Sequence, residues 1–152
     1  MLDQRIRRCL EGGTSILVGT VDAKGTPSCC RASAITSDDD LKTIAIYLPM
    51  ATSQQTLKDI ATTHRMAVAA THVVEHFSIQ LKGTANTARL ARDEEVALVE
   101  ERMEAFADVL FSLGFPRRLT RSVAYWPSFV VDMRVEEVFE QTPGPNAGAR
   151  LR

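Results

Sequence analysis

The amino-acid sequence predicts a mainly β fold of the α+β class, a small antiparallel β-barrel with flanking helices. Several short strand-like runs are separated by turn residues, and only a few helical runs lie between them. An open sheet of so many short strands would expose its edges, whereas a barrel pairs them. With 152 residues, 45% of them hydrophobic, the chain is large enough for one core without covalent staples. We therefore expect a single domain over residues 1–152.

The N-terminal third is predicted to be a helix followed by a hairpin. Apolar residues recur at helical spacing over 2–10, and two glycines end the pattern. Residues 15–21 and 26–36 are strand-like, and the turn between them, Asp22 to Gly25, has the glycine that a tight turn needs. These two strands are expected to pair antiparallel.

The middle of the chain is predicted to alternate between strand and helix. After a Ser-Asp-Asp-Asp turn, residues 41–48 are predicted to form a strand, residues 53–62 a helix and residues 66–73 another strand. Residues 77–90 form a long alternating run, so one face of this strand has to meet solvent or a ligand.

The C-terminal third is predicted to contain the longest helix and a last strand. Asp93 caps this helix, and Gly114 and Pro116 end it. An exposed basic loop around Arg117 follows, and residues 129–141 alternate as a strand before a turn-rich tail. The helix carries an apolar stripe that is expected to pack in the core or against a second chain, made of Val96, Val99, Met103, Phe106, Leu110 and Leu113.

Charge and cysteine content narrow the class of protein. The formal net charge is −1 and the basic residues are scattered, so nothing indicates a nucleic-acid surface. Cys9, Cys29 and Cys30 are odd in number and lack C-x-x-C spacing, which argues against a disulfide framework and a zinc ribbon. No apolar run approaches the roughly 20 residues of a transmembrane helix. A cytoplasmic protein without a signal peptide is expected.

The predicted strand 26–36 carries a candidate anion-binding residue. Period-2 alternation places Cys29, Arg31, Ser33 and Ile35 on one face and the even-numbered residues on the other. Arg31 is then held among small side chains, where a planar cation suits a phosphate or a polarised heterocycle. The alternative is an arginine in a salt bridge at a sheet edge.

The start of the predicted helix 53–62 is a second candidate anion site. Hydroxyls, side-chain amides and free backbone N–H groups are expected to converge there and to hold a phosphate without a lysine. An ordinary helix cap with polar surface residues is the alternative. The side chains concerned are Thr52, Ser53, Gln54, Gln55 and Thr56.

The pentapeptide His72-Val-Val-Glu-His76 matches the H-x-x-E-H pattern of inverted zincins. That metal site requires a helix, because histidines four apart on a strand are too distant to share one zinc ion. Strand-like runs flank the pentapeptide on both sides. It is therefore predicted to be a hairpin connection, and no metal site is expected.

Four segments, taken in order, resemble a known family. They are Arg31-Ala-Ser-Ala-Ile35, Tyr47-Leu-Pro-Met-Ala-Thr-Ser-Gln-Gln55, Ser78-Ile-Gln-Leu-Lys-Gly83 and Tyr125-Trp-Pro-Ser-Phe129. Together with the ending from Val135 to Pro145, their order over nearly the whole chain resembles the pyridoxamine 5′-phosphate oxidase-like FMN-binding split barrel family. The resemblance implies an antiparallel Greek-key split β-barrel and a homodimer with two FMN molecules at its interface.

The resemblance also implies which residues contact FMN. Arg31 is similar to the family's strand arginine at the flavin phosphate, and the backbone from Ala32 through Ser33 and Ala34 to Thr36 follows the cofactor. The other implied contacts are Tyr47 and Leu48 on the next strand, Thr52, Ser53, Gln54, Gln55 and Thr56 at the helix start, Ser78, Gln80 and Lys82 facing the ring system, and Trp126, Phe139 and Gln141 near the partner chain's site.

Departures from the family pattern bear on the activity. Either Gln54 and Gln55 or Ser53 and Gln54 stand where the vitamin B6 oxidases usually have an Arg-Lys pair. Thr36 replaces a lysine, and the arginine- and serine-rich substrate loop has no counterpart between Arg92 and Arg121. Pyridoxamine phosphate oxidation is therefore not expected. An FMN-dependent oxidoreductase or reductase acting on a small molecule is expected instead. A non-catalytic flavin-binding module, and a split-barrel relative that binds haem or a deazaflavin coenzyme, are the alternatives.

Overall fold

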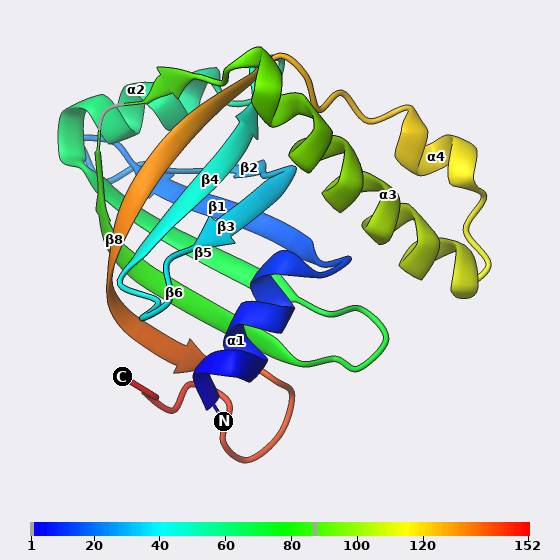
Figure 1. Ribbon diagram of the computed structural model, residues 1–152. Helices are drawn as coiled ribbons and strands as arrows, with labels where there is room; N and C mark the ends of the chain where they lie inside the picture. The colour runs from blue at the N-terminus through cyan, green and yellow to red at the C-terminus, as the bar shows by residue number, and fades with distance from the viewer. Residues whose placement is uncertain (1, 87) are drawn as a thin grey trace.

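The computed structural model describes residues 2–86 and 88–152, which form an antiparallel sheet curled into a barrel with helices around it (Figure 1). This confirms the predicted fold class. The eight strands of the described residues are β1 (Ser15–Val21), β2 (Pro27–Arg31), β3 (Ala34–Ser37), β4 (Thr43–Pro49), β5 (Arg65–Thr71), β6 (Ser78–Ala85), β7 (Arg89–Leu90) and β8 (Ser128–Glu140).

Four α-helices accompany the sheet in the described part of the chain: α1 (Leu2–Glu11), α2 (Gln54–Thr63), α3 (Val96–Ser112) and α4 (Arg117–Arg121). A 3-10 turn, Asp93–Glu95, leads into α3, so this helix begins three residues after the predicted Asp93 cap. The basic segment predicted as a loop is helix α4, because its arginines pair with acidic residues of α3. None of the helices described is long and apolar enough to cross a membrane.

The chain closes the barrel at Ala32 and Ser33. The strand order is β2-β1-β5-β6-β8-β4-β3, so β2 and β3 stand at opposite ends although they are consecutive in sequence. The N–H of Ala32 donates to the carbonyl of Ile16 on β1 at 3.2 Å, and the N–H of Ser33 donates to that of Tyr47 on β4 at 2.9 Å. The prediction of one strand over 26–36 is therefore wrong.

The break also ends the predicted side-chain alternation. Cys29 and Arg31 are exposed and Cys30 is buried, as alternation requires. From Ala32 to Ile35, however, every residue is buried. Arg31 thus belongs to one end of the sheet order, whereas Ser33, two residues later in the chain, already pairs with β4 near the other end.

The long run predicted over 77–90 is also divided, into β6 and β7; residue 87 lies outside the described residues. β6 pairs with β5 on one side and with residues 133–140 of β8 on the other. The register of the β6–β8 pairing shifts between Lys82 and Gly83. A Cβ atom at Gly83 would lie 1.9 Å from the carbonyl oxygen of Arg134. Only glycine permits this close approach, which bends the sheet at the bulge.

The main core fills the barrel. Inward side chains alternate along the strands, as in β5, where Met66, Val68 and Ala70 are buried and the residues between them are partly exposed. Ile6 and Leu10 of α1 and Ile60 of α2 join this core. The two helices therefore cover the barrel by inserting apolar side chains, each worth roughly 1.5–3 kcal/mol when fully buried.

Helix α2 is held against the first hairpin by a buried carboxylate. Asp59, 2% exposed, accepts hydrogen bonds from the hydroxyls of Thr20 (2.7 Å) and Ser28 (2.5 Å) and from the side-chain amide of Gln55 (2.8 Å). The Ser28 hydrogen bond and the other two hold the pKa of Asp59 below its usual range despite burial. This network sets the position of α2 beside β1 and β2.

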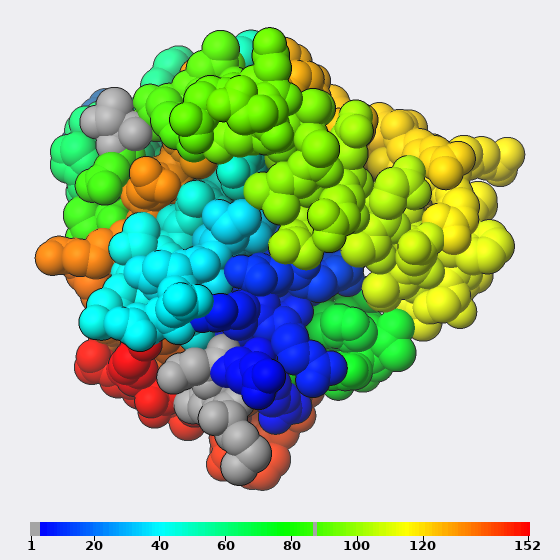
Figure 2. All heavy atoms as spheres, in the orientation of Figure 1, coloured from blue at the N-terminus to red at the C-terminus, as the bar shows by residue number. Residues whose placement is uncertain are grey.

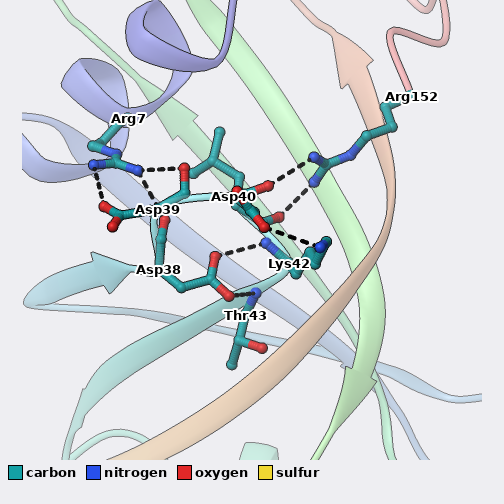
Figure 3. Close-up of polar contacts among 8 residues, drawn as sticks. Arg7, Asp38, Asp39, Asp40, Lys42, Thr43 and Arg152 are labelled. Carbon is teal, nitrogen blue, oxygen red and sulfur yellow. Dashed lines mark hydrogen bonds and ion pairs between the residues drawn. The ribbon is translucent and has the colours of Figure 1, made fainter.

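The turn between β3 and β4 is held from two sides (Figure 3). The guanidinium of Arg7 on α1 donates to the carboxylate of Asp39 at 3.2 Å and to the carbonyl of Asp38 at 3.0 Å. The guanidinium of Arg152 donates to the carbonyl of Asp40 at 3.1 Å. Segments from both ends of the chain thus meet at one turn, although each exposed contact contributes little by itself.

Helices α3 and α4 form an arm that stands away from the barrel (Figure 1) and protrudes from the body in the space-filling view (Figure 2). The arm is anchored where α3 begins. The Tyr47 hydroxyl on β4 donates to Glu95 at 3.0 Å, and Arg89 donates to both oxygens of the same carboxylate at 2.7 and 2.8 Å. Near this anchor, Val99 packs in a second, smaller core with Ala34 and Tyr47.

Candidate functional site

A cleft of about 700 Å³ lies between the barrel and the α3–α4 arm. This volume is in the range of small-molecule and cofactor sites. The residues that line it are Thr14, Ser15, Cys29, Cys30, Arg31, Ala32, Ser33, Pro49, Thr52 and Val73 on the barrel side, and Met103, Phe106, Leu110, Phe115, Leu119, Thr120, Val123 and Ala124 on the arm side.

Arg31 supplies the only charge among the described residues that line the cleft. Its position at the end of β2, where the chain leaves one edge of the sheet for the other, places it in the floor. Its Nη2 lies 3.4 Å from the hydroxyl of Ser15, and its guanidinium lies 5.4 Å from the centre of the Phe106 ring. No carboxylate of the described residues forms an ion pair with Arg31, so the salt bridge considered from the sequence does not form.

Ser33 is the second polar group in the floor. Its side chain is 7% exposed, and its hydroxyl forms no hydrogen bond with another described residue. This oxygen is not among the enclosed polar atoms that lack a partner, so it is accessible from the cleft and available to a ligand. The backbone of Ser33 is fixed by the bond to Tyr47 that closes the barrel. The cleft therefore contains a rigidly placed, unpartnered hydroxyl close in sequence to its one cation.

The start of α2 contributes less to the cleft than the sequence predicts. Thr52 lines it, whereas the other side chains of this group turn elsewhere. Ser53 donates to the carbonyl of Pro49 at 2.7 Å, Gln55 donates to Asp59, and Thr56 donates to the sulfur of Cys30 at 3.3 Å. Gln54 is exposed. The structure thus does not bring these five side chains together around one point.

The adjacent cysteines lie on opposite faces of β2, as alternation predicts. Cys29 is exposed and Cys30 is buried, and both line the cleft. Burial raises the pKa of the Cys30 thiol, which outweighs the opposing hydrogen bond from Thr56. Cys30 is therefore a protonated, weakly nucleophilic group at neutral pH.

The implied contacts on β4 lie behind the floor of the cleft. Leu48 is buried in the main core, and Ala34 on β3 is buried in the smaller one. Tyr47 is 4% exposed, and its burial together with the neighbouring Glu95 raises its pKa to about 12. The Arg89 hydrogen bonds hold the pKa of Glu95 at about 2. This group is a charged anchor for α3 and leaves Tyr47 neutral.

The implied contacts on β6 and near the C-terminus lie outside this cleft. Ser78 is buried and shares a hydrogen bond of 2.8 Å with Thr71, while Lys82 is exposed with its ammonium 4.6 Å from the ring centre of Phe139. Gln80 and Trp126 are half-buried, and Gln141 is exposed. Their roles in a dimeric site stay predictions.

Two features of the site were not predicted from the sequence. The arm is one: the stripe of Met103, Phe106 and Leu110 was expected to pack in the core or against a second chain, and here it lines the cleft. The contribution of α4 is the other. The helical spacing of these apolar residues indicates that one face of α3 avoids water. The spacing does not indicate which part of the barrel that face is turned toward.

The pentapeptide from His72 to His76 forms the connection between β5 and β6, which confirms the hairpin prediction. The Nδ1 atom of His72 accepts from the N–H of Glu75 at 3.2 Å within this loop. Val73 of the loop reaches the rim of the cleft, and no histidine is among the described residues that line it.

No protein-family model and no curated protein matches the sequence. Solved structures do resemble the fold. HupZ from Group A Streptococcus aligns with a TM-score of 0.61 and 22% identity over 97% of this chain and 100% of its own. A candidate pyridoxamine 5′-phosphate oxidase from Lactobacillus delbrueckii aligns with a TM-score of 0.50 and 18% identity over 82% of this chain and 83% of its own. An FMN-binding protein from Syntrophomonas wolfei aligns with a TM-score of 0.53 and 12% identity over 91% of this chain and 87% of its own.

These similarities establish the fold as the split barrel of the pyridoxamine 5′-phosphate oxidase-like proteins. The same fold serves an F420 reductase (TM-score 0.55, 12% identity, 87% and 94% covered) and HutZ, a haem storage protein from Vibrio cholerae (0.51, 11%, 91% and 92%). Proteins of this shape therefore carry different cofactors, and the choice of cofactor depends on the residues of the cleft.

Proposed function

We propose that this protein binds FMN in the cleft and works as an FMN-dependent oxidoreductase or reductase on a small molecule. The observation that carries the proposal is that the hydroxyl of Ser33, which has no hydrogen-bond partner among the described residues, lines the same cleft as the unpaired cation of Arg31. A phosphate oxygen can accept hydrogen bonds from both groups, and it would give the Ser33 hydroxyl the partner that it lacks within the chain. Thr52, on the same side of the cleft, supplies a third donor.

Arg31 is available for this role. Its contacts with Ser15 and Phe106 are a long hydrogen bond and a cation–π contact, both weaker than a charge-assisted bond to phosphate. The guanidinium is thus held over the cleft without being neutralised. An anion that enters gains a partner and displaces only weak interactions.

The rest of the cleft fits the apolar body of a flavin. Phe106 and Met103 from the arm and Ala32 from the floor offer flat or small apolar surface. When bound, FMN supplies the two-electron chemistry, while the chain supplies binding, orientation and exclusion of water. The buried Cys30 thiol stays protonated, and hydride transfer to a flavin does not require an acid or a base from the chain.

We further propose that the protein is a homodimer with the cofactor at its interface. Leu17 on β1 is 42% exposed and lies opposite Arg31 in the β1–β2 ladder, on the strand face next to the cleft. On the neighbouring strand, the half-buried Ala67 and Ala69 offer little side-chain bulk. A second chain covering this surface would bury Leu17 and bring further residues to the cofactor.

The departures at Gln54 and Gln55 argue against pyridoxamine phosphate as substrate, because the cleft offers one cation to a ligand and has none left for a phosphorylated substrate. Haem is the less favoured cofactor, since the described lining contains no histidine to serve as an axial ligand. A module that holds FMN without turnover remains the alternative in function.

An absorption spectrum tests these proposals. The purified protein is incubated with excess FMN, desalted and examined from 300 to 700 nm, and an equimolar nicotinamide donor is then added without oxygen. Retained flavin absorbance that bleaches with the donor is the expected result. Retained absorbance without bleaching would indicate a binding module. If the protein stays colourless with FMN but gains a Soret band when haemin is added, the cofactor is haem and the FMN proposal is rejected.

A further inference from the structure

The arm side of the cleft differs in chemistry from the barrel side. Arg31, Ser33 and Thr52 all lie on the barrel side. The arm presents side chains without charge: Met103, Phe106, Leu110, Phe115, Leu119, Val123 and Ala124, with Thr120 as the single polar residue. A ligand whose phosphate is bound on the barrel side therefore leaves the apolar wall of the arm free to contact a second molecule.

The charged residues of the arm are directed away from this wall. Arg117 pairs with Asp108 and Glu104, and Arg121 pairs with Glu104 at 3.4 Å. Glu104 and Arg121 border a separate cavity of about 230 Å³ rather than the cleft. Arg118 is exposed and is not among the lining residues. The wall thus offers no countercharge to an ionic ligand, and burying such a ligand against it would be costly.

Thr120 is the second observation that points to a ligand. Its side chain is 5% exposed, and its hydroxyl has no hydrogen-bond partner among the described residues. Thr120 and Met103 border both the cleft and the smaller cavity, so only these two side chains are shared by the two spaces. A buried hydroxyl on an otherwise apolar wall is left for a ligand with one polar group to pair with.

We propose that the α3–α4 wall is a second subsite, which binds an uncharged ring compound carrying a hydroxyl or carbonyl group that pairs with Thr120. Phe106 and Phe115 provide the aromatic surface for the ring, and Leu119, which is 53% exposed, adds apolar surface to the same wall. This inference rests on the proposed function, because it assigns the substrate class to the part of the cleft that the flavin phosphate does not use.

Two naphthalene probes distinguish this subsite from the anion site. 2-Naphthol has an uncharged ring with a hydroxyl, and naphthalene-2-sulfonate has the same ring with a charge. Each is titrated by calorimetry into the full-length protein, with and without saturating FMN. 2-Naphthol is expected to bind in both cases. The sulfonate is expected to bind at least about 10-fold more weakly once FMN occupies Arg31.

Variants test the wall itself. Thr120→Val keeps the shape of the side chain and removes the hydroxyl, so 2-naphthol should bind roughly 5- to 10-fold more weakly. The melting temperature should stay equal or rise, since an unpaired buried group is lost. Leu119→Asp should abolish 2-naphthol binding. Leu113→Asp is the matched control, because Leu113 is similarly exposed (48% against 53%) and does not line the cleft.

Three results would overturn the subsite: unchanged affinity in Thr120→Val, equal loss in both aspartate variants, or loss in Leu119→Asp together with a halved sedimenting mass. The last would mean that a second copy of the chain covers the wall. FMN affinity is measured on the same samples. FMN binding without 2-naphthol binding rejects the subsite alone, whereas 2-naphthol binding in a protein that never retains FMN supports the subsite and rejects the proposed cofactor.

Discussion

Arg31 and Ser33 are the two polar residues on which the proposed anion site depends. The guanidinium has no carboxylate partner among the described residues, and the hydroxyl of Ser33 forms no hydrogen bond with any of them. Neither group is neutralised or paired within the chain, so both are available to a ligand. Together, in one cleft, they form an electropositive corner that binding of an anion would stabilise.

Replacing Arg31 tests this corner directly. Arg31→Ala should weaken FMN binding by about 1.5–3 kcal/mol, since a charge-assisted bond to phosphate is lost. Quenching of flavin fluorescence gives the dissociation constant. Arg31→Lys should retain part of the affinity because it keeps the charge but not the planar fork. Unchanged affinity in Arg31→Ala would remove this residue from the site.

Gln54 offers a gain-of-affinity test of the cofactor position. It is the first residue of α2 and is exposed, so a lysine can be accommodated there. If the phosphate lies near the start of this helix, Gln54→Lys should tighten FMN binding by about 1 kcal/mol through a new charge contact. The same titration measures it. An unaltered dissociation constant would count against placing the phosphate by the helix start.

At the scale of elements, two hydrogen-bonded carboxylates, one buried and one half-buried, hold the helices that border the cleft. Helix α2 is positioned by Asp59 with its three donors, and α3 by Glu95 with Arg89 and Tyr47. Thr52 precedes α2, and α3 contributes side chains to the apolar wall. Small shifts of either anchor would therefore change the shape of the cleft.

The anchor of α2 predicts a dependence of stability on pH. Because the folded-state pKa of Asp59 is lowered, its contribution is present above the unfolded value of about 3.9 and is lost as pH falls through the folded value. Asp59→Asn should lower the free energy of unfolding at pH 7 by about 1–3 kcal/mol and flatten the acid side of the profile.

Urea unfolding measured from pH 7 to pH 3 checks this expectation. Asp132→Asn is the control, because Asp132 is exposed on β8 and a surface change of this kind normally stays within about 0.5 kcal/mol. If Asp59→Asn and the control behave alike at both ends of the pH range, the carboxylate does not anchor the helix.

At the scale of the whole molecule, the barrel is closed by its own chain and clasped by its ends. The step from Ala32 to Ser33 joins the two ends of the strand order, and Arg7 and Arg152 meet at the β3–β4 turn (Figure 3). This closed unit leaves Leu17 exposed on β1, next to the half-buried Ala67 and Ala69 of β5. This exposure motivates the proposed dimer.

Sedimentation tests the proposed dimer. Leu17→Glu should convert a dimer to a monomer, since it places a charge in the proposed interface, while the folded barrel persists because Leu17 is already exposed in one chain. Leu90→Glu is the matched control: Leu90 is 55% exposed on the short strand β7. A monomeric wild-type protein, or equal effects of both variants, would reject this interface.

The sequence by itself determined the order and type of most elements, because periodicity and turn chemistry are local properties. The hairpin turn with Gly25 at φ +86°, the end of α3 near Gly114 and the alternation along β5 follow from residues that are neighbours in the chain. The resemblance to split barrels likewise predicted the fold.

Only the tertiary structure decided where strands change partners and which side chains face one another. The break at Ala32 and Ser33 has no turn residue to announce it, since it arises from closing the sheet on itself. The same long-range packing directs Ser53 and Thr56 inward and leaves the Thr120 hydroxyl unpaired at the edge of the cleft. Such pairings depend on contacts between distant segments, which spacing within a segment does not encode.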